Sequence, residues 1–211
     1  ALAEKGTDRL RCQLARALAW LDGGHGEEAV QAAGEALREA EFHPRHQAEA
    51  GALYAQALAQ CGKFSAALAA GKKALAAADA AAPDQRLGVL NALSYIHYAQ
   101  GRLAEAVRWQ REAIATAERQ ENLATAVIGE GNIAALLASI GDVAGTYAQA
   151  RRTRERYATI HIAENSSFGI VNHIVLGTSA AALGRFDEAL DALNEATRAA
   201  GEAAAPAAQA K

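Results

Sequence analysis

Five glycines recur along the chain at nearly constant spacing, and this periodicity restricts the possible fold more than any other feature of the sequence. They are Gly24, Gly62, Gly101, Gly141 and Gly184, and they are separated by 38, 39, 40 and 43 residues. Each glycine follows a stretch with a helical pattern, where a residue that tolerates a positive φ angle can end the helix and reverse the chain. The period predicts a solenoid of about five antiparallel helix pairs, because a single pair cannot bury its own apolar face.

Small residues at fixed distances from each glycine indicate how the two helices of a pair would pack. One stands seven positions before the glycine, and two more stand five and twelve positions after it. Residues seven apart lie on one face of a helix, so the small positions would let the two backbones approach closely. In chain order the three sets are Ala17, Ala55, Ser94, Ala134 and Gly177; Ala29, Ala67, Ala106, Thr146 and Ala189; and Ala36, Ala74, Ala113, Thr153 and Ala196.

The composition agrees with closely packed helices and excludes several classes of protein. The chain is 51% hydrophobic but only 5% aromatic, so its core must be filled mostly by Ala and Leu. A formal charge of -3 from 21 basic and 24 acidic residues predicts no direct binding to nucleic acid. No apolar run approaches the roughly 18 residues that span a bilayer, and the first residues lack a signal-peptide pattern. We therefore expect a soluble protein without a membrane partner.

Two cysteines, Cys12 and Cys61, stand far apart in helical contexts. They form no metal-ligand spacing, which predicts a reducing, cytoplasmic compartment. The alternative interpretation is that both are small buried side chains. The sequence starts at Ala1 and contains no Met, so we also expect a piece of a longer polypeptide.

Two segments show the repeat most clearly, "ALAQCGKFSAALAAGKKAL" at 57–75 and "YAQGRLAEAVRWQREAI" at 98–114. With the periodic small residues, they resemble the tetratricopeptide repeat family. The resemblance implies an all-α, right-handed superhelix over residues 1–200, with units at about 10–42, 46–81, 84–120, 122–161 and 165–200. Residues 201–211 are expected to form a flexible tail.

The units depart from the family pattern in two ways. They exceed the family's usual period of about 34 residues, and they lack the large aromatic residue early in the first helix. Units of this length look most like the helical arrays of large bacterial transcription activators of the maltose-activator type, of quorum-peptide receptors and of kinesin light chains.

The resemblance also implies a binding groove lined by the first helix of each unit. The matching positions here hold amides and aromatic rings that could cradle a peptide. Two tyrosines among them have an alternative role, which is only to cover the core. The basic residues with which chaperone-binding members hold carboxylates have no match, because those positions hold small or neutral side chains. The expected groove residues are Gln56, Asn91, Tyr95, Tyr98 and Asn132.

No residue pattern predicts catalysis. The histidines of "HPRH" at 43–46 lack further ligands nearby, so no metal site is expected, and His97 and His173 fall on faces assigned to packing. The basic run 151–156 is interleaved with Glu155, which indicates either a solvated helix face or a contact for an acidic partner. No nucleotide-binding, serine hydrolase or metalloprotease motif is present, so we expect neither a cofactor nor an enzyme.

Two functions remain open at this point. The first is a non-enzymatic scaffold, part of a larger bacterial protein, whose groove binds a protein, a peptide or another domain of the same polypeptide. The second is an effector-sensing domain of a bacterial transcription regulator. The oligomeric state and the identity of the partner stay open.

Overall fold

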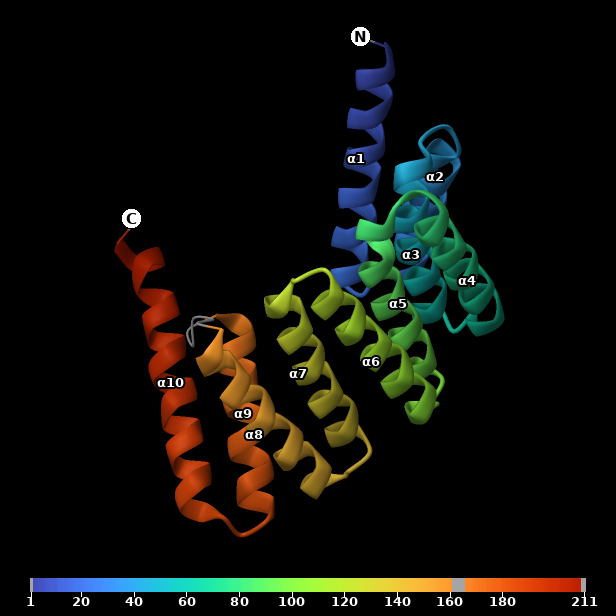
Figure 1. Ribbon diagram of the computed structural model, residues 1–211. Helices are drawn as coiled ribbons and strands as arrows, with labels where there is room; N and C mark the ends of the chain where they lie inside the picture. The colour runs from blue at the N-terminus through green and yellow to red at the C-terminus, as the bar shows by residue number, and fades with distance from the viewer. Residues whose placement is uncertain (1, 161–165, 210–211) are drawn as a thin grey trace. The chain divides into compact units, whose positions relative to one another are not determined.

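The computed structural model describes residues 2–160 and 166–209, and every regular element in these ranges is helical (Figure 1). The predicted all-α class and the antiparallel helix pairs are therefore confirmed. Short 3-10 turns, η1 (Ala40–Phe42) and η2 (Pro83–Gln85), follow the first two pairs. In chain order the helices are α1 (Leu2–Asp22), α2 (Gly26–Glu39), α3 (Pro44–Gln60), α4 (Phe64–Ala81), α5 (Arg86–Ala99), α6 (Leu103–Arg119), α7 (Leu123–Ser139), α8 (Val143–Thr159), α9 (Ser167–Ala182) and α10 (Phe186–Gln209).

The chain forms two compact units, Ala1–Ala113 and Ile114–Lys211, and the boundary between them falls inside α6. In the first unit α3 packs against α1, α2, α4 and α5. In the second unit α7, α8, α9 and α10 pack in sequence, and α9 lies against both α8 and α10. The single continuous array over residues 1–200 stays a prediction.

The recurring glycines end the first helix of each pair, as the sequence predicts. Their φ angles all lie between 71° and 77°. At Gly101, the glycine N–H donates to the Tyr98 carbonyl at 2.8 Å, and the next N–H, of Arg102, donates to the His97 carbonyl at 2.9 Å. This pair of bonds is the Schellman motif, which satisfies carbonyls that the helix leaves open. The same pair of bonds occurs at the other four glycines.

The small residues lie where the helices of a pair meet, and all three predicted sets are buried. The Ser94 hydroxyl donates to the carbonyl of Ala106 on the facing helix at 2.9 Å, which requires the two backbones to be close. A Cβ atom at Gly177 would lie 2.6 Å from Cγ of Leu193, so that contact admits only glycine without rearrangement. Close approach of the paired helices thus depends on side-chain size at these positions.

His97 on α5 is part of the packed interior, as its position in the repeat predicts. It is 8% exposed, and its Nδ1 atom is buried without a hydrogen-bond partner among the described residues. Burial lowers the pKa of His97, because a charged imidazole would lose its hydration, while the carboxylate of Glu105 acts in the opposite direction. The histidine is therefore suited to packing in its neutral form.

The segment "NSS" at 165–167 has side chains that favour the start of a helix. The Ser166 hydroxyl accepts a hydrogen bond from the Gly169 N–H at 3.1 Å and caps α9, while Asn165 lies outside the described residues. Helix α10 continues through residues 201–209, where the sequence predicts a flexible tail. Ala has the highest helix propensity, which explains why an Ala-rich segment extends the helix.

A reciprocal pair of substitutions tests the role of the positive φ angles. Gly141 has a φ of 77° and open space where a Cβ would lie, with no atom within 4 Å, and Glu121 has a φ of 57° after α6. We expect Gly141→Ala to lower the free energy of unfolding by about 1–2 kcal/mol and Glu121→Gly to raise it by about 1 kcal/mol. Urea unfolding followed by circular dichroism measures both. If both substitutions changed the free energy of unfolding in the same direction and by the same amount, the positive φ angles would not be the cause of the change.

A second prediction concerns pH. Because the folded-state pKa of His97 is lowered, the unfolded state binds a proton more readily, and stability is lost as the pH falls below about 6.5. His97→Gln should reduce the pH dependence of the unfolding free energy by at most about 1.4 kcal/mol per pH unit in that range. Urea unfolding of both proteins at several pH values from mildly alkaline to mildly acidic measures the slopes. An unchanged slope would show that His97 titrates alike in both states.

Candidate functional site

The first helices of three successive pairs, α1, α3 and α5, line a hollow of about 570 Å³ within the first unit. We call it the α1–α3–α5 groove. Its wall combines apolar side chains with amides and a few charged groups. The lining residues are Arg11, Leu14, Ala15, Leu18, His46, Glu49, Ala52, Leu53, Gln56, Gln85, Gly88, Val89 and Asn91.

Two of the predicted site residues, Gln56 and Asn91, lie in this groove. The Asn91 Oδ1 atom accepts a hydrogen bond from Gln110 Nε2 at 3.2 Å, which orients the amide and leaves its N–H groups for another acceptor. Gln56 is half-buried and makes no hydrogen bond to any described residue. Each amide can therefore offer hydrogen bonds to the backbone of a bound chain.

The groove also contains charged groups. Nδ1 of His46 is 3.5 Å from Oε2 of Glu49, within ion-pair distance when the imidazole is protonated. Arg11 on α1 is exposed. Apolar side chains with a few polar groups among them are the general composition of a site that binds peptides or small molecules.

The other three predicted residues lie elsewhere. Tyr95 is half-buried and packs against the largest hydrophobic cluster of the first unit, so it covers core, which was the alternative role. Tyr98 is 41% exposed at the end of α5 but does not line the groove. Asn132 is exposed on α7 in the second unit. Of the five residues, the structure brings only Gln56 and Asn91 together.

Sequence reasoning missed the contribution of α1, although the repeat contained the signal. Leu14 stands ten residues before its turn glycine, as Asn91 does, and Leu18 stands six before it, as Gln56 does. Both leucines line the groove, and Leu18 is 48% exposed. Extending the repeat register to the first unit would have identified them.

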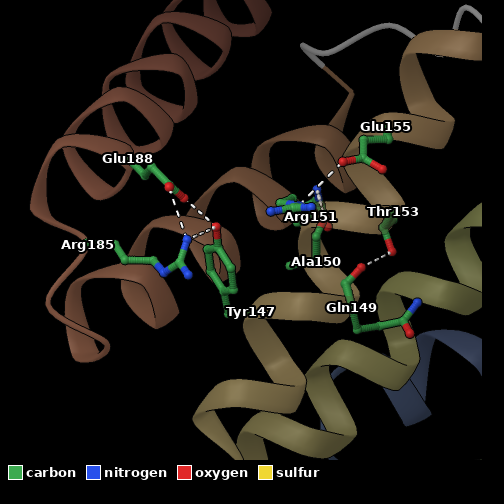
Figure 2. A network of polar contacts seen from close by, with 9 residues as sticks. Tyr147, Gln149, Ala150, Arg151, Thr153, Glu155, Arg185 and Glu188 are labelled. Carbon is green, nitrogen blue, oxygen red and sulfur yellow. Dashed lines mark hydrogen bonds and ion pairs between the residues drawn. The ribbon is translucent and has the colours of Figure 1, made fainter.

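A separate polar network connects α8 to α10 in the second unit (Figure 2). The Tyr147 hydroxyl bonds to the Glu188 carboxylate, and Nη1 of Arg185 lies 3.1 Å from that hydroxyl and 3.2 Å from Oε1 of Glu188. The Arg185 guanidinium also stacks 4.7 Å from the ring centroid of Tyr147. The bond from Tyr147, assisted by Arg185, lowers the pKa of Glu188. A carboxylate kept ionised in this way joins two helices and is a poor proton acceptor.

The basic run on α8 divides between paired and exposed side chains. Arg151 lies 3.4 Å from Glu155, and Arg156 pairs with Glu118 at 3.2 Å and with the buried Glu130. The two other members of the run, Arg152 and Arg154, are exposed. Half of the run therefore has a structural role within the second unit.

No group of three or more His, Cys, Asp or Glu side chains able to hold a metal ion occurs within 2–160 and 166–209. His43 and His46 of "HPRH" belong to no such group among those residues. None of the helices that the structure describes combines the length and apolar character needed to cross a bilayer.

Comparison with known proteins supports the tetratricopeptide repeat for this chain. Residues 86–119, which contain α5 and α6, match the family model described as Tetratricopeptide repeat. No curated protein matches the sequence.

Several solved structures share the fold. BtubC (BKLC) from P. vanneervenii is similar with a TM-score of 0.70 and 20% identity over 88% of this chain and 77% of that one. A putative kinesin light chain from Podosopora anserina with nearly identical TPR-like repeats has a TM-score of 0.67 and 17% identity over 92% and 96% of the two chains. PlcR from Bacillus thuringiensis, solved with the peptide PapR7 and DNA, has a TM-score of 0.69 and 19% identity over 91% and 69%. The chain thus has the fold of tetratricopeptide-like repeat proteins, and its residues 86–119 match the repeat itself.

Proposed function

We propose that this chain is a non-enzymatic scaffold whose α1–α3–α5 groove binds a peptide or a segment of another protein, including a domain of the same polypeptide. The observation that supports this most directly is the pair of amides, Gln56 and Asn91, between the apolar side chains of Leu14, Leu18 and Val89. The amides can form hydrogen bonds with the backbone of a bound chain, and the apolar side chains of the groove can pack against its apolar side chains.

The remaining properties of the chain agree with such a role. The near balance of 21 basic and 24 acidic residues favours a protein partner over nucleic acid or a membrane surface. Cys12 and Cys61 are free thiols, which suits a reducing, cytoplasmic compartment.

An effector-sensing role in a transcription regulator is the second candidate. It is favoured by the similarity in fold to PlcR, which was solved in complex with a peptide and DNA. On this hypothesis the groove binds an effector and a neighbouring DNA-binding domain responds. The coding sequence on either side of this segment tests the hypothesis, since a DNA-binding module should be present there.

The groove is tested by selecting peptides from a displayed random library against the full chain and measuring their affinity by fluorescence anisotropy. Leu18→Glu should weaken the binding of a selected peptide by about tenfold or more, because it replaces an apolar contact in the groove by a charge. Gln56→Ala should weaken it about two- to tenfold through one lost neutral hydrogen bond.

Leu123→Glu is the matched control, because Leu123 is 44% exposed, close to the 48% of Leu18, and lies on α7 outside the groove. It should leave the affinity unchanged. Selection of no peptide, or of peptides that bind all three variants equally, would remove the groove from the proposed function.

A further inference from the structure

Helix α10 has an apolar stripe on its outward side. Successive residues of this stripe are separated alternately by four and by three positions along the helix. All of them are exposed, and the exposed fraction is 72% for Phe186 and 61% for Leu190. The opposite side of the helix is buried against α9 by alanines, among them Ala189 and Ala192. Figure 1 shows α10 at the outer edge of its unit. The stripe, called the α10 stripe below, consists of Phe186, Leu190, Leu193, Thr197 and Ala200.

The earlier helix pairs show what normally covers this face. Leu190 stands six residues after its turn glycine, and the same position holds Val30 on α2, Leu68 on α4 and Tyr147 on α8. Each of these three belongs to, or packs against, a hydrophobic cluster that includes residues of the next first helix, which is α3, α5 or α9. Tyr147 is only 6% exposed. The face is thus a helix-packing surface in α2, α4 and α8.

The position of Leu193 gives the same result. Its counterparts are Ala33, Gly71, Gln110 and Ala150, all buried. A Cβ atom at Gly71 would lie 2.8 Å from Cδ2 of Leu93 on α5, which shows how closely the next helix approaches. On α10, Leu193 packs on one side against Gly177 of α9 and is still 37% exposed, and no helix of the described chain covers that exposed part.

The other end of the chain is different. In α3 and α5, certain repeat positions pack on the preceding helix pair. The residues at the same repeat positions of α1 are all exposed, and they are Cys12, Ala15, Arg16 and Ala19. Nη2 of Arg16 bonds to Oε2 of Glu35 at 2.8 Å. The outward face of α1 at these positions is therefore small and polar. The outward face of α10, in contrast, carries the large apolar side chains of Phe186 and Leu190.

We propose that the α10 stripe is a dimer interface, on which α10 of a second copy of this chain packs in antiparallel orientation. Spacing that alternates between four and three is the heptad seam of a coiled coil, and a symmetric interface lets one stripe cover its own copy.

The sizes of the side chains favour the antiparallel orientation. With Leu190 opposite Leu193 of the second copy, Phe186 lies opposite Thr197, so a large side chain meets a small one. A parallel pair would place the two copies of Phe186 against each other and the two of Thr197 against each other. Beside the seam of the antiparallel pair, Asn194 lies next to Asn194 of the second copy, and Asp187 lies next to Gly201 of the second copy. No two side chains of like charge are therefore adjacent there.

A head-to-tail arrangement, with α1 of one copy on α10 of the next, fits less well. It would bury the bonded pair Arg16 and Glu35 beside leucines, and a charged pair taken out of water loses more than it gains unless further bonds satisfy it. It would also leave both end faces open and so form chains of copies. Pairing through α10 leaves α1 in water.

The size of the stripe sets the expected affinity. Residues 186–200 of a helix span about 21 Å at about 1.5 Å per residue, which makes a small interface. Interfaces of this size are weak, and we expect a dissociation constant on the order of micromolar.

Sedimentation velocity of the full chain over a series of concentrations tests the dimer. The wild type should pass from monomer to dimer and no further. Leu190→Glu should raise the dissociation constant at least about 100-fold, because the symmetric dimer loses two buried leucines. Circular dichroism checks that this exposed substitution leaves the monomer folded.

Ile140→Glu is the matched control, since Ile140 is 59% exposed in the same unit but lies outside the stripe. It should dimerise as the wild type does. A wild type that stays monomeric at high micromolar concentration, or an equal loss in both variants, would overturn the proposal.

Two further variants test the geometry. In a background with Cys12→Ser and Cys61→Ser, Phe186→Cys together with Thr197→Cys should form a disulfide-linked dimer on oxidation, while Phe186→Cys alone should not. A linked dimer from Phe186→Cys alone would overturn the antiparallel orientation. Ala19→Glu on α1 should leave the association unchanged, and loss of association there, or growth beyond a dimer, would indicate the head-to-tail arrangement instead.

Discussion

Close approach of paired helices is the constraint on which the rest of this structure depends. Where a first helix crosses its partner, the side chains are reduced to Ala, Ser or Gly, and the backbones nearly touch. At Gly177 the space that a Cβ would need is already taken by Leu193. At Ser94 a hydroxyl reaches a carbonyl of the facing helix, so even the polar atom of a small residue is satisfied by proximity. The close packing explains how a chain that is 5% aromatic can form a dense core.

The close packing of the helices also restricts which polar side chains can be buried between them. Thr146 and Thr153 replace alanine in the fourth pair, and each hydroxyl bonds to a backbone carbonyl four residues earlier on its own helix. Asn172 on α9 donates to the Ala150 carbonyl of α8 at 3.2 Å. Glu130 is buried but paired with Arg156. Each of these four side chains therefore has at least one local partner, which limits the cost of removing it from water.

The features of the fold that can be predicted from the sequence are those determined by residues close to one another along the chain. A glycine after a helical stretch takes a positive φ angle for reasons contained within six residues, and alanines two turns apart share a face by helix geometry alone. The groove depends instead on which helices lie side by side. Tyr95 has the repeat position of Gln56, yet it covers the hydrophobic cluster, because the longer ring reaches the core and the amide stays at the edge. Leu14 and Leu18 belong to the groove only because α1 lies beside α3.

A repeat fold uses one packing surface many times. The position six residues after the turn glycine is apolar in all five pairs. In α2, α4 and α8 this residue packs with the first helix of the next pair, whereas Leu190 on α10 is 61% exposed. The outward side of α10 therefore keeps the apolar character of a packing surface. The groove and the α10 stripe are then separate surfaces, one formed by first helices in the first unit and one by a second helix in the second, and a partner can occupy either without the other.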